Sequence, residues 1–185
     1  MVEIVKPALE HLPSYKAALE RGWSPDNVRL MEATREQLAA IELDPVAFLA
    51  SLDDPEARGD PITLPDGTQV PRLPGFRRWI WDGEASGSIG FRWQKGTAEL
   101  PSHVLGHIGY AVVPWKRGRG YATEALRLML AEARAVGLDY AEITTDLDNP
   151  ASQKVVLANG GRPVGRFVKI AAYGGAESLR FRIDL

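Results

Sequence analysis

The feature that most constrains the fold is the stretch of residues 107–136, in which an apolar run, a basic corner and a helical pattern follow one another directly. The apolar run at residues 107–113 predicts a strand, and the corner PWKRGRG at residues 114–120 predicts a tight turn. Beyond the corner, apolar residues recur at helical spacing until Gly137, which is typical of a helix end. This stretch therefore predicts a strand, a corner and a helix in direct succession.

The corner has the composition of an anion-binding site. A helix start presents backbone N–H groups that lack intrahelical partners, at the positive end of the helix dipole. Gly118 and Gly120 would let a ligand approach this backbone closely. The side chains of Lys116, Arg117 and Arg119 would add positive charge. We therefore expect a phosphate or pyrophosphate at the corner, and a plain turn with solvated arginines is the alternative.

Two other phosphate-binding motifs do not fit this corner. A Walker loop ends in Gly-Lys followed by Ser or Thr, and the chain contains no such tripeptide. A dinucleotide-binding fingerprint needs a third glycine after GxGxx, and the chain has Thr123 at that position. Both motifs are therefore excluded.

The corner resembles the acyl-CoA loop of the GNAT N-acetyltransferase superfamily, whose pattern is Arg or Gln, two residues, Gly, one residue, then Gly or Ala. Arg117, Gly120 and Ala122 stand at the matching positions. The resemblance extends over roughly residues 75–165, through the later segments TTDLDNPASQKVV and NGG. It is closest to bacterial members similar to ribosomal-protein acetyltransferases. The resemblance implies an α/β (α+β) fold with a mixed, mostly antiparallel central sheet flanked by helices.

The resemblance also implies an activity, the transfer of an acetyl group from acetyl-CoA to a primary amine that attacks the thioester directly. Acetyl-CoA would be a cosubstrate, and no metal would take part. By matching positions, the resemblance assigns acetyl-CoA binding to Ala111, Val112, Arg117, Gly118, Arg119, Gly120, Tyr121, Ala122, Thr123, Asn149 and Ser152. Asn149 also fits a helix N-cap before Pro150, and one side chain could serve both roles.

The group that protonates the departing thiolate is harder to assign. Many GNAT proteins carry a tyrosine seven residues after the asparagine, and this chain has Val156 there. Water or a tyrosine from elsewhere, such as Tyr110 or Tyr173, would have to take this role. The departure also keeps open a non-catalytic acyl-CoA-binding sensor, and a nucleotide-binding module is a further alternative.

His107 is the candidate general base, because relatives often carry a Glu or His base on this strand and an unperturbed histidine titrates near neutral pH. A structural histidine at a strand edge is an equal alternative. The other candidate bases are carboxylates that the sequence does not rank, namely Asp146, Asp148 and Glu84.

Composition limits the other function classes. A length of 185 residues suits one domain, and a formal net charge of −2 argues against nucleic acid as the main partner. The chain has no cysteine and three dispersed histidines, so we expect neither a thiolate nucleophile nor a metal site. Without a signal peptide or a membrane-spanning run, we expect a cytoplasmic protein, monomer or homodimer, with a small-molecule or peptide amine as acceptor and no membrane partner.

The order of predicted elements suits a single domain at 1–185. Helices are predicted at 9–21 and 28–50, the second broken at Asp44-Pro45, so that 1–60 forms the substrate side. The segment 53–75, rich in Pro, Gly and Asp, is either a linker or an ordered loop over the substrate side. The acyl-CoA-binding core is placed at 75–165 and a C-terminal hairpin at 164–185. Strands are predicted at 2–5, 76–81, 88–93, 141–145, 164–172 and 179–185, with Trp79, Trp81 and Trp93 either in the core or in a substrate pocket.

Overall fold

The computed structural model describes residues 2–185, so that Met1, the first residue of the predicted domain range, lies outside the described residues. The elements in chain order are β1 (Glu3–Val5), α1 (Leu12–Glu20), α2 (Leu30–Leu43), α3 (Pro45–Ser51), β2 (Asp53–Asp54), β3 (Ile62–Thr63), β4 (Gln69–Val70), β5 (Gly75–Trp81), β6 (Ala85–Arg92), β7 (Ile108–Val112), η1 (Pro114–Lys116), α4 (Tyr121–Arg134), β8 (Tyr140–Asp146), α5 (Pro150–Ala158), β9 (Arg162–Val168), η2 (Ala171–Tyr173) and β10 (Glu177–Asp184). The predicted strand, corner and helix are thus β7, η1 and α4. No helix among residues 2–185 is long and apolar enough to cross a membrane.

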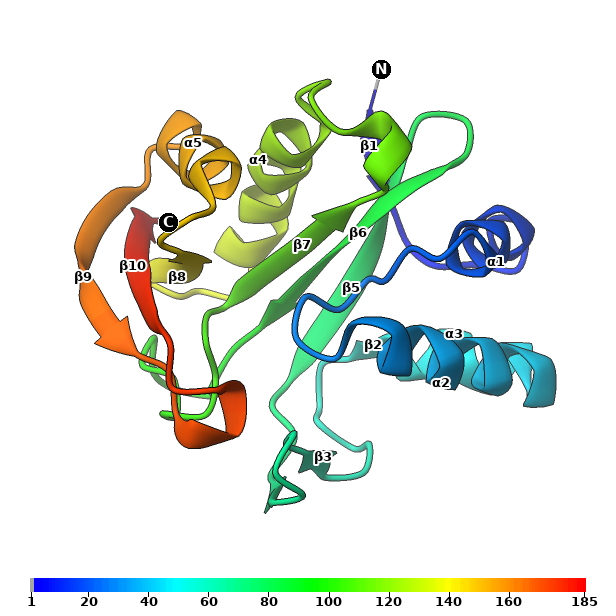
Figure 1. Cartoon of the computed structure of the whole chain (residues 1–185), viewed down its shortest axis with the longest axis horizontal. Helices are drawn as coiled ribbons and strands as arrows, with labels where there is room; N and C mark the ends of the chain where they lie inside the picture. Colours follow the sequence, from blue (N-terminus) through cyan, green and yellow to red (C-terminus); the bar gives the residue numbers. More distant parts are fainter. Residues whose placement is uncertain (1) are drawn as a thin grey trace.

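Two antiparallel sheets form the centre of the molecule. The first has the strand order β1-β5-β6-β7, with β2 also paired to β5, and the second has the order β8-β10-β9. Strands β7 and β8 lie next to each other at one end, where the His107 N–H donates to the Glu142 carbonyl over 2.7 Å, and the two sheets then diverge (Figure 1). The predicted fold class, a mostly antiparallel sheet flanked by helices, is confirmed.

Each face of the first sheet is covered by its own set of helices, because its strands alternate apolar side chains between two cores. Ile89 and Phe91 of β6 pack with α4, whose Leu126 and Met129 are fully buried. On the opposite face, α1, α2 and α3 enclose a second core in which Tyr15 stacks on Trp79 with ring centroids 4.1 Å apart. Figure 1 shows α1 to α3 on one side of the sheet and α4 and α5 on the other.

The predicted break between the second and third helices is confirmed at Asp44 and Pro45. The Asp44 side chain accepts hydrogen bonds from the N–H groups of Val46 and Ala47, and Pro45 occupies the first turn of α3. The segment 53–75 contains three short strands, β2, β3 and β4, rather than irregular structure alone. Its pairing with β5 and its buried Leu64 make it part of the folded structure rather than a linker.

The turn between β5 and β6 is shorter than the predicted residues 82–87, because β6 already begins at Ala85. Gly87 permits this extension, since a Cβ atom at this position would lie 2.4 Å from the Ala111 carbonyl oxygen of β7. Of the three tryptophans, Trp79 is fully buried and Trp93 nearly so, which places both in the core, whereas Trp81 is half-buried.

Candidate active site

The corner between β7 and α4 presents unpaired backbone donors to solvent. Gly118 and Gly120 have φ angles of 76° and 77°, a left-handed conformation that favours glycine. Gly120 is the N-cap of α4 and has no side chain to cap the helix. The backbone N–H groups of residues 118–123 donate to no other residue in the part of the chain that the structure describes. The corner therefore has the donors and the dipole of an anion site.

The basic side chains of the corner have different surroundings. Arg119 is exposed, and Arg117 donates from Nε to the Val112 carbonyl over 3.2 Å. Lys116 is buried, with Nζ 2.6 Å from Asp82 and 2.8 Å from Glu84. The expectation that Lys116 offers charge to a ligand is therefore wrong, because two carboxylates already neutralise it.

Asp82 anchors both ends of the corner to the turn between β5 and β6. It accepts hydrogen bonds from Lys116 and, over 2.7 Å, from the hydroxyl of Tyr121 at the start of α4. Burial raises the pKa of Asp82, but the hydrogen bonds from Lys116, Tyr121 and Ser86 outweigh burial and hold this pKa well below its usual value. The side chain of Tyr121 thus supports the corner, and only its backbone N–H remains for a ligand.

The backbone of β7 alternates between the neighbouring strand and the gap next to β8. The Arg92 N–H donates to the His107 carbonyl, and the Val113 N–H donates to the Ser86 carbonyl. Because an antiparallel ladder uses every second residue, Ala111 also faces β6, whereas Tyr110 and Val112 face the gap. The expectation that Ala111 offers its backbone to a ligand is therefore wrong, because its backbone groups face β6. The backbone of Tyr110 faces the gap instead.

Strand β7 and helix α5 meet through Tyr110 and Ser152. The Tyr110 hydroxyl lies 2.8 Å from Ser152 Oγ, and burial raises the pKa of Tyr110 to about 12. The Ser152 N–H donates to Asn149 Oδ1 over 3.0 Å, which confirms the N-cap. Asn149 Nδ2 makes no hydrogen bond within residues 2–185 and faces solvent. Val156, one turn further along α5, is fully buried in the core.

The surroundings of His107 argue against its predicted role as general base. The side chain is fully buried, and Nδ1 accepts a hydrogen bond from the Glu142 N–H over 2.9 Å. The remaining nitrogen, Nε2, must then carry the proton, so no lone pair is left to accept another. Burial, only partly offset by the charge of Glu142, lowers the pKa of His107 to about 4. The structure instead gives His107 a structural role where the sheets diverge.

The other candidate acids and bases are scattered. Asp146 is paired with Lys169 and Ser178, and the hydrogen bond from Lys169 is the main cause of its lowered pKa. Glu84 is paired with Lys116, and Asp148 is exposed. Tyr173 lies in η2, between β9 and β10, and burial raises its pKa. Only Tyr110 stands between β7 and α5.

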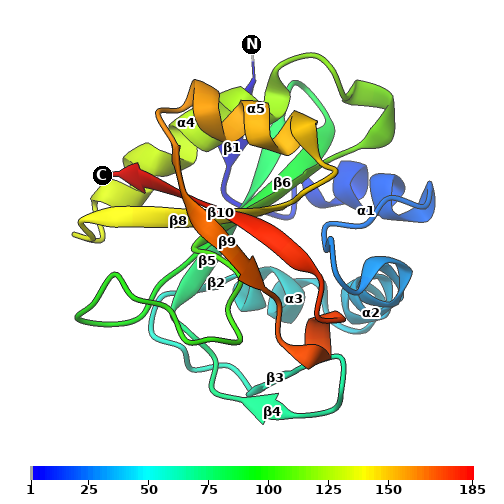
Figure 2. The same ribbon diagram turned by 60° about the vertical axis from the view of Figure 1, so that its left-hand side comes forward.

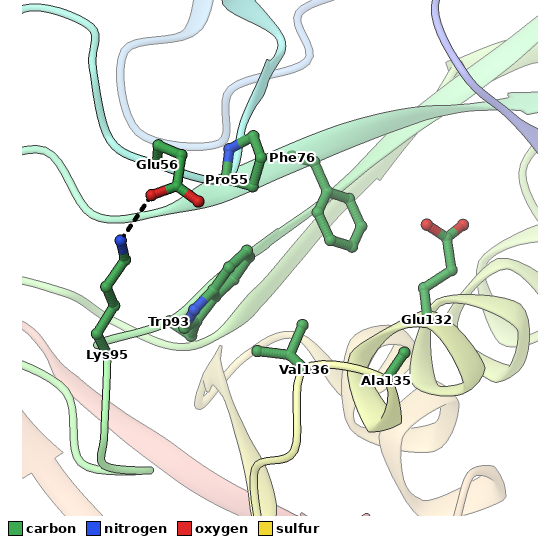
Figure 3. Close-up of a pocket in the computed structure, with 8 residues that line it drawn as sticks. All are labelled: Pro55, Glu56, Phe76, Trp93, Lys95, Glu132, Ala135 and Val136. Atoms are coloured by element: carbon green, nitrogen blue, oxygen red, sulfur yellow. Dashed lines mark hydrogen bonds and ion pairs between the residues drawn. The ribbon is translucent and has the colours of Figure 1, made fainter.

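A cavity of about 540 Å³ lies at the other end of α4. Phe76, Trp93 and Val136 line it, and an ion pair between Lys95 and Glu56 crosses its rim (Figure 3). The glycine corner precedes the first residue of α4, and this cavity borders the last turn, a full helix of 14 residues away. The cavity is therefore separate from the anion site.

Comparison with known proteins identifies the family. The family described as Acetyltransferase (GNAT) domain matches residues 52–162, more than half of the chain. The chain belongs to the GNAT acetyltransferase family. The matched segment includes the glycine corner, the diverging strands β7 and β8, and α5 up to its end.

Solved structures with the same fold include several GNAT acetyltransferases. The microcin C7 self-immunity acetyltransferase MccE, in complex with acetyl-CoA and AMP, superposes with a TM-score of 0.62 at 15% identity, covering 100% of this chain and 92% of that chain. RimL, a ribosomal L7/L12 α-N-protein acetyltransferase bound to coenzyme A, gives a TM-score of 0.62 at 14% identity, covering 100% and 94%. A spermidine N-acetyltransferase SpeG chimera from Vibrio cholerae and hSSAT gives 0.60 at 11% identity, covering 99% and 94%. No curated protein matches the sequence.

Family membership establishes the reaction class. This protein is an acetyl-CoA-dependent N-acetyltransferase, as the sequence predicted. Within residues 2–185 no group of three or more metal-ligating side chains is present.

The buried state of His107 predicts how stability depends on pH. The folded pKa of about 4 lies below the reference value of 6.5, so the unfolded chain binds a proton that the folded chain refuses. The contribution of the neutral His107 to the free energy of unfolding is therefore fully present above about pH 6.5, and it falls by on the order of 2–3 kcal/mol as the pH drops to about 4. In His107→Gln this part of the loss should disappear, since Gln does not titrate.

Denaturant unfolding of both proteins at a series of pH values measures the free energy of unfolding, and the slope of this free energy against pH should differ between the two proteins. A variant that keeps the wild-type slope would contradict the buried, neutral state of His107. The pH profile of kcat/KM should be the same for both proteins, because His107 takes no proton from the amine.

The Asp82 network predicts a coupled effect on stability and donor binding. Asp82→Asn should lower the free energy of unfolding by roughly 1–3 kcal/mol, because Lys116 would remain buried with only Glu84 as a carboxylate partner. The dissociation constant for CoA, measured by calorimetry, should rise as the corner loses its anchor. Asp139→Asn removes an exposed carboxylate that makes no hydrogen bond or ion pair among the described residues, and it is the matched control. Equal behaviour of the two variants would refute the anchoring role.

Proposed function

We propose that the diphosphate of acetyl-CoA binds at residues 117–123 and that the acetyl group passes to a primary amine beside β7. The observation that carries this proposal is the row of backbone N–H groups at residues 118–123, which donate to no other described residue. These donors lie at the start of a 14-residue helix, where the dipole adds to their attraction for an anion. The exposed Arg119 adds a full positive charge beside them.

The arm between diphosphate and thioester would follow the gap between β7 and α5. Tyr110 and Val112 direct their backbone groups into this gap, and Asn149 has an amide nitrogen without a partner in the described chain. The carbonyl oxygens of Tyr110 and Val112 already accept from Asn27 and Arg117, so the backbone N–H groups of both residues and the Asn149 amide remain as donors to the carbonyl oxygens of the arm. We propose Tyr110, Val112, Asn149 and Ser152 as the contacts of the arm, with Ala111 replaced by Tyr110.

The reaction needs orientation, a polarising donor and two proton movements. The amine nitrogen bonds to the thioester carbon, the carbon–sulfur bond breaks, and the sulfur takes up a proton. Backbone N–H groups of β7 would stabilise the oxyanion. The Tyr110 hydroxyl is protonated at neutral pH, because burial raises its pKa to about 12, and it reaches α5 one turn before Val156. We propose Tyr110 as the proton donor to sulfur and solvent water as the acceptor of the amine proton.

The acceptor would approach from the side of residues 2–60. The side chain of Asn27, in the loop between α1 and α2, donates to the Tyr110 carbonyl over 3.0 Å, so this loop borders β7. The structural neighbours differ in acceptor, a ribosomal protein in one and spermidine in another, which supports either a peptide or a small molecule here. We propose one catalytic unit over the whole chain, monomer or homodimer, without a nucleic acid or membrane partner. It would act in the cytoplasm.

A second candidate is a sensor that binds acetyl-CoA without turnover. The buried Val156, in place of a tyrosine on α5, is the observation that favours it. Release of free CoA thiol during incubation with acetyl-CoA and a panel of amines separates the two candidates. Turnover with any amine supports the enzyme, and tight acetyl-CoA binding without turnover across the panel supports the sensor.

The glycine corner predicts a site-specific loss of donor binding. Gly120→Val and Gly137→Val each place a β-branched residue at a positive φ, 77° and 83°, with no heavy atom within 4 Å of the new Cβ. Both should lose similar stability, on the order of 1–3 kcal/mol, from backbone strain. Only Gly120→Val should also weaken CoA binding, by about tenfold or more, because its side chain would fill the space in front of the N–H groups. Calorimetry with CoA on both folded variants tests this, and equal affinities would place the site elsewhere.

The position of Tyr110 predicts a loss of turnover without a loss of donor affinity. Tyr110→Phe should lower kcat about tenfold to a hundredfold, since a general acid commonly contributes this much. The dissociation constant for acetyl-CoA should change little, because the backbone of β7 is unaltered. Tyr140→Phe removes a hydroxyl that makes no hydrogen bond in the described chain and serves as control. Unchanged kcat in Tyr110→Phe would leave water as the proton donor.

A further inference from the structure

Two arginines lie on the face of the first sheet that is turned away from α4. Arg77 of β5 pairs with Gly90 of β6, which in turn pairs with Gly109 of β7, so these residues form one row across the sheet. Arg92 follows Gly90 by two residues and therefore lies on the same face. The two glycines leave room above the strands for both arginine side chains.

The guanidinium groups occupy that room. A Cβ atom on Gly90 would lie 3.7 Å from Cζ of Arg77, and a Cβ atom on Gly109 would lie 3.5 Å from Nη2 of Arg92. Both cations thus extend across the sheet towards β7. The charge of Arg92 also contributes to the lowered pKa of His107, which places it near the point where the two sheets diverge.

Neither arginine has a carboxylate partner among residues 2–185. Arg78, the next residue on β5 but on the opposite face, pairs with Glu132 over 2.8 Å. Arg77 donates only to neutral oxygens, Ser88 Oγ over 3.1 Å and the Pro25 carbonyl over 3.5 Å. Arg92 makes no side-chain hydrogen bond within the described chain. Loss of hydration around the guanidinium group and, second, the charge of Arg77 lower the pKa of Arg92, while part of the residue remains exposed.

Loops distant in sequence surround this pair. The loop between α1 and α2 contributes Asp26, whose charge acts on Arg92 without an ion pair. Tyr173 of η2 lies close enough to Arg92, Asp26 and Asp66 for their charges to affect its pKa. Figure 2 shows the turn between β9 and β10, which contains η2, at the same lower end of the molecule as the β3–β4 hairpin. Arg77 and Arg92 therefore lie on the side of β7 from which an acceptor would approach, away from the α4 face.

We propose that Arg77 and Arg92 bind an anionic oxygen group of the acceptor, a carboxylate or a phosphate, and so select amines that carry such a group. Two guanidinium groups on one face, neither of them paired with a carboxylate among the described residues, match the two oxygens of a carboxylate or phosphate. The same pair repels polyamines, whose additional ammonium groups would face two positive charges without a carboxylate within ion-pair distance. This inference rests on the proposed function, because it presumes an amine acceptor beside β7.

Matched pairs of amines test the proposal. Each pair differs only in the anionic group: an amino acid and its amide, a dipeptide with and without a free C-terminal carboxylate, and ethanolamine phosphate and ethanolamine, with spermidine as cationic probe. CoA thiol release gives kcat/KM for each. The anionic member should exceed its neutral partner about tenfold or more, as expected for charge-assisted hydrogen bonds, and spermidine should be poor. Which anionic members react best distinguishes carboxylate from phosphate.

Arg92→Gln provides the decisive variant, because its side chain makes no hydrogen bond that the fold would lose. It should lower kcat/KM for anionic acceptors about tenfold, leave their neutral partners unchanged, and keep the KM for acetyl-CoA. Arg92→Lys should retain part of the preference, and Arg35→Gln, on the exposed side of α2, should retain all of it.

The outcomes separate this proposal from the proposed function. Three results would overturn the anionic acceptor and leave acetyl transfer intact. In Arg92→Gln, these are an equal loss of kcat/KM for anionic and neutral acceptors or a raised KM for acetyl-CoA. In the wild-type protein, the third is a higher kcat/KM for spermidine than for the anionic amines. If no amine of any charge releases CoA thiol, the proposed function itself fails.

Discussion

The hydrogen bonds between His107 and Glu142 are the constraint on which the rest of the site depends. The His107 N–H and Nδ1 bond the backbone of Glu142, while its carbonyl accepts from Arg92 of β6, so one residue joins three strands. Gly106 permits this approach, because a Cβ atom there would lie 2.9 Å from the Glu142 carbonyl oxygen. Beyond this point β7 and β8 share no strand pairing among residues 2–185, and the backbone of β7 faces a gap. Backbone groups beside a buried strand need partners, and here Asn27 and Arg117 supply two of them.

The glycine corner depends on a second set of contacts, made far from it in sequence. A loop with two glycines at positive φ has few intrinsic constraints, and donors that await a ligand contribute nothing to its order. Asp82 compensates for this by binding Lys116 before the glycines and Tyr121 after them. The corner is thereby held at both ends while its central N–H groups remain available. Preorganisation of this kind lowers the entropic cost of binding an anion.

The sequence predicted what is local and missed what is distant. The strand, corner and helix at residues 107–136, the break at Asp44 and the cap at Asn149 follow from spacing and from residues next to each other in the chain. Ala111 faces away from the gap because every second residue of β7 bonds to β6. This alternation depends on the register between β6 and β7, which cannot be read from one sequence. His107 looked like a base because its residue type suits one, and only its burial and its bond to Glu142 show otherwise. No sequence motif indicated a role for Asp82, Arg77 or Arg92.

Strand β7 lies beside both proposed ligand sites, and the two ligands would carry their negative groups at different ends of this strand. Its even residues, Tyr110 and Val112, direct backbone groups to the gap, where the donor arm would lie, and β7 leads into the corner that would hold the diphosphate. At its odd position 109 a glycine lies beneath the Arg92 guanidinium. The anion of the donor and the proposed anion of the acceptor would thus bind at opposite ends of β7, one at backbone N–H groups and one at guanidinium groups. Two negative ligands bound side by side would repel each other; separated along a strand, they leave between them the uncharged stretch where an amine nitrogen can approach a thioester carbon.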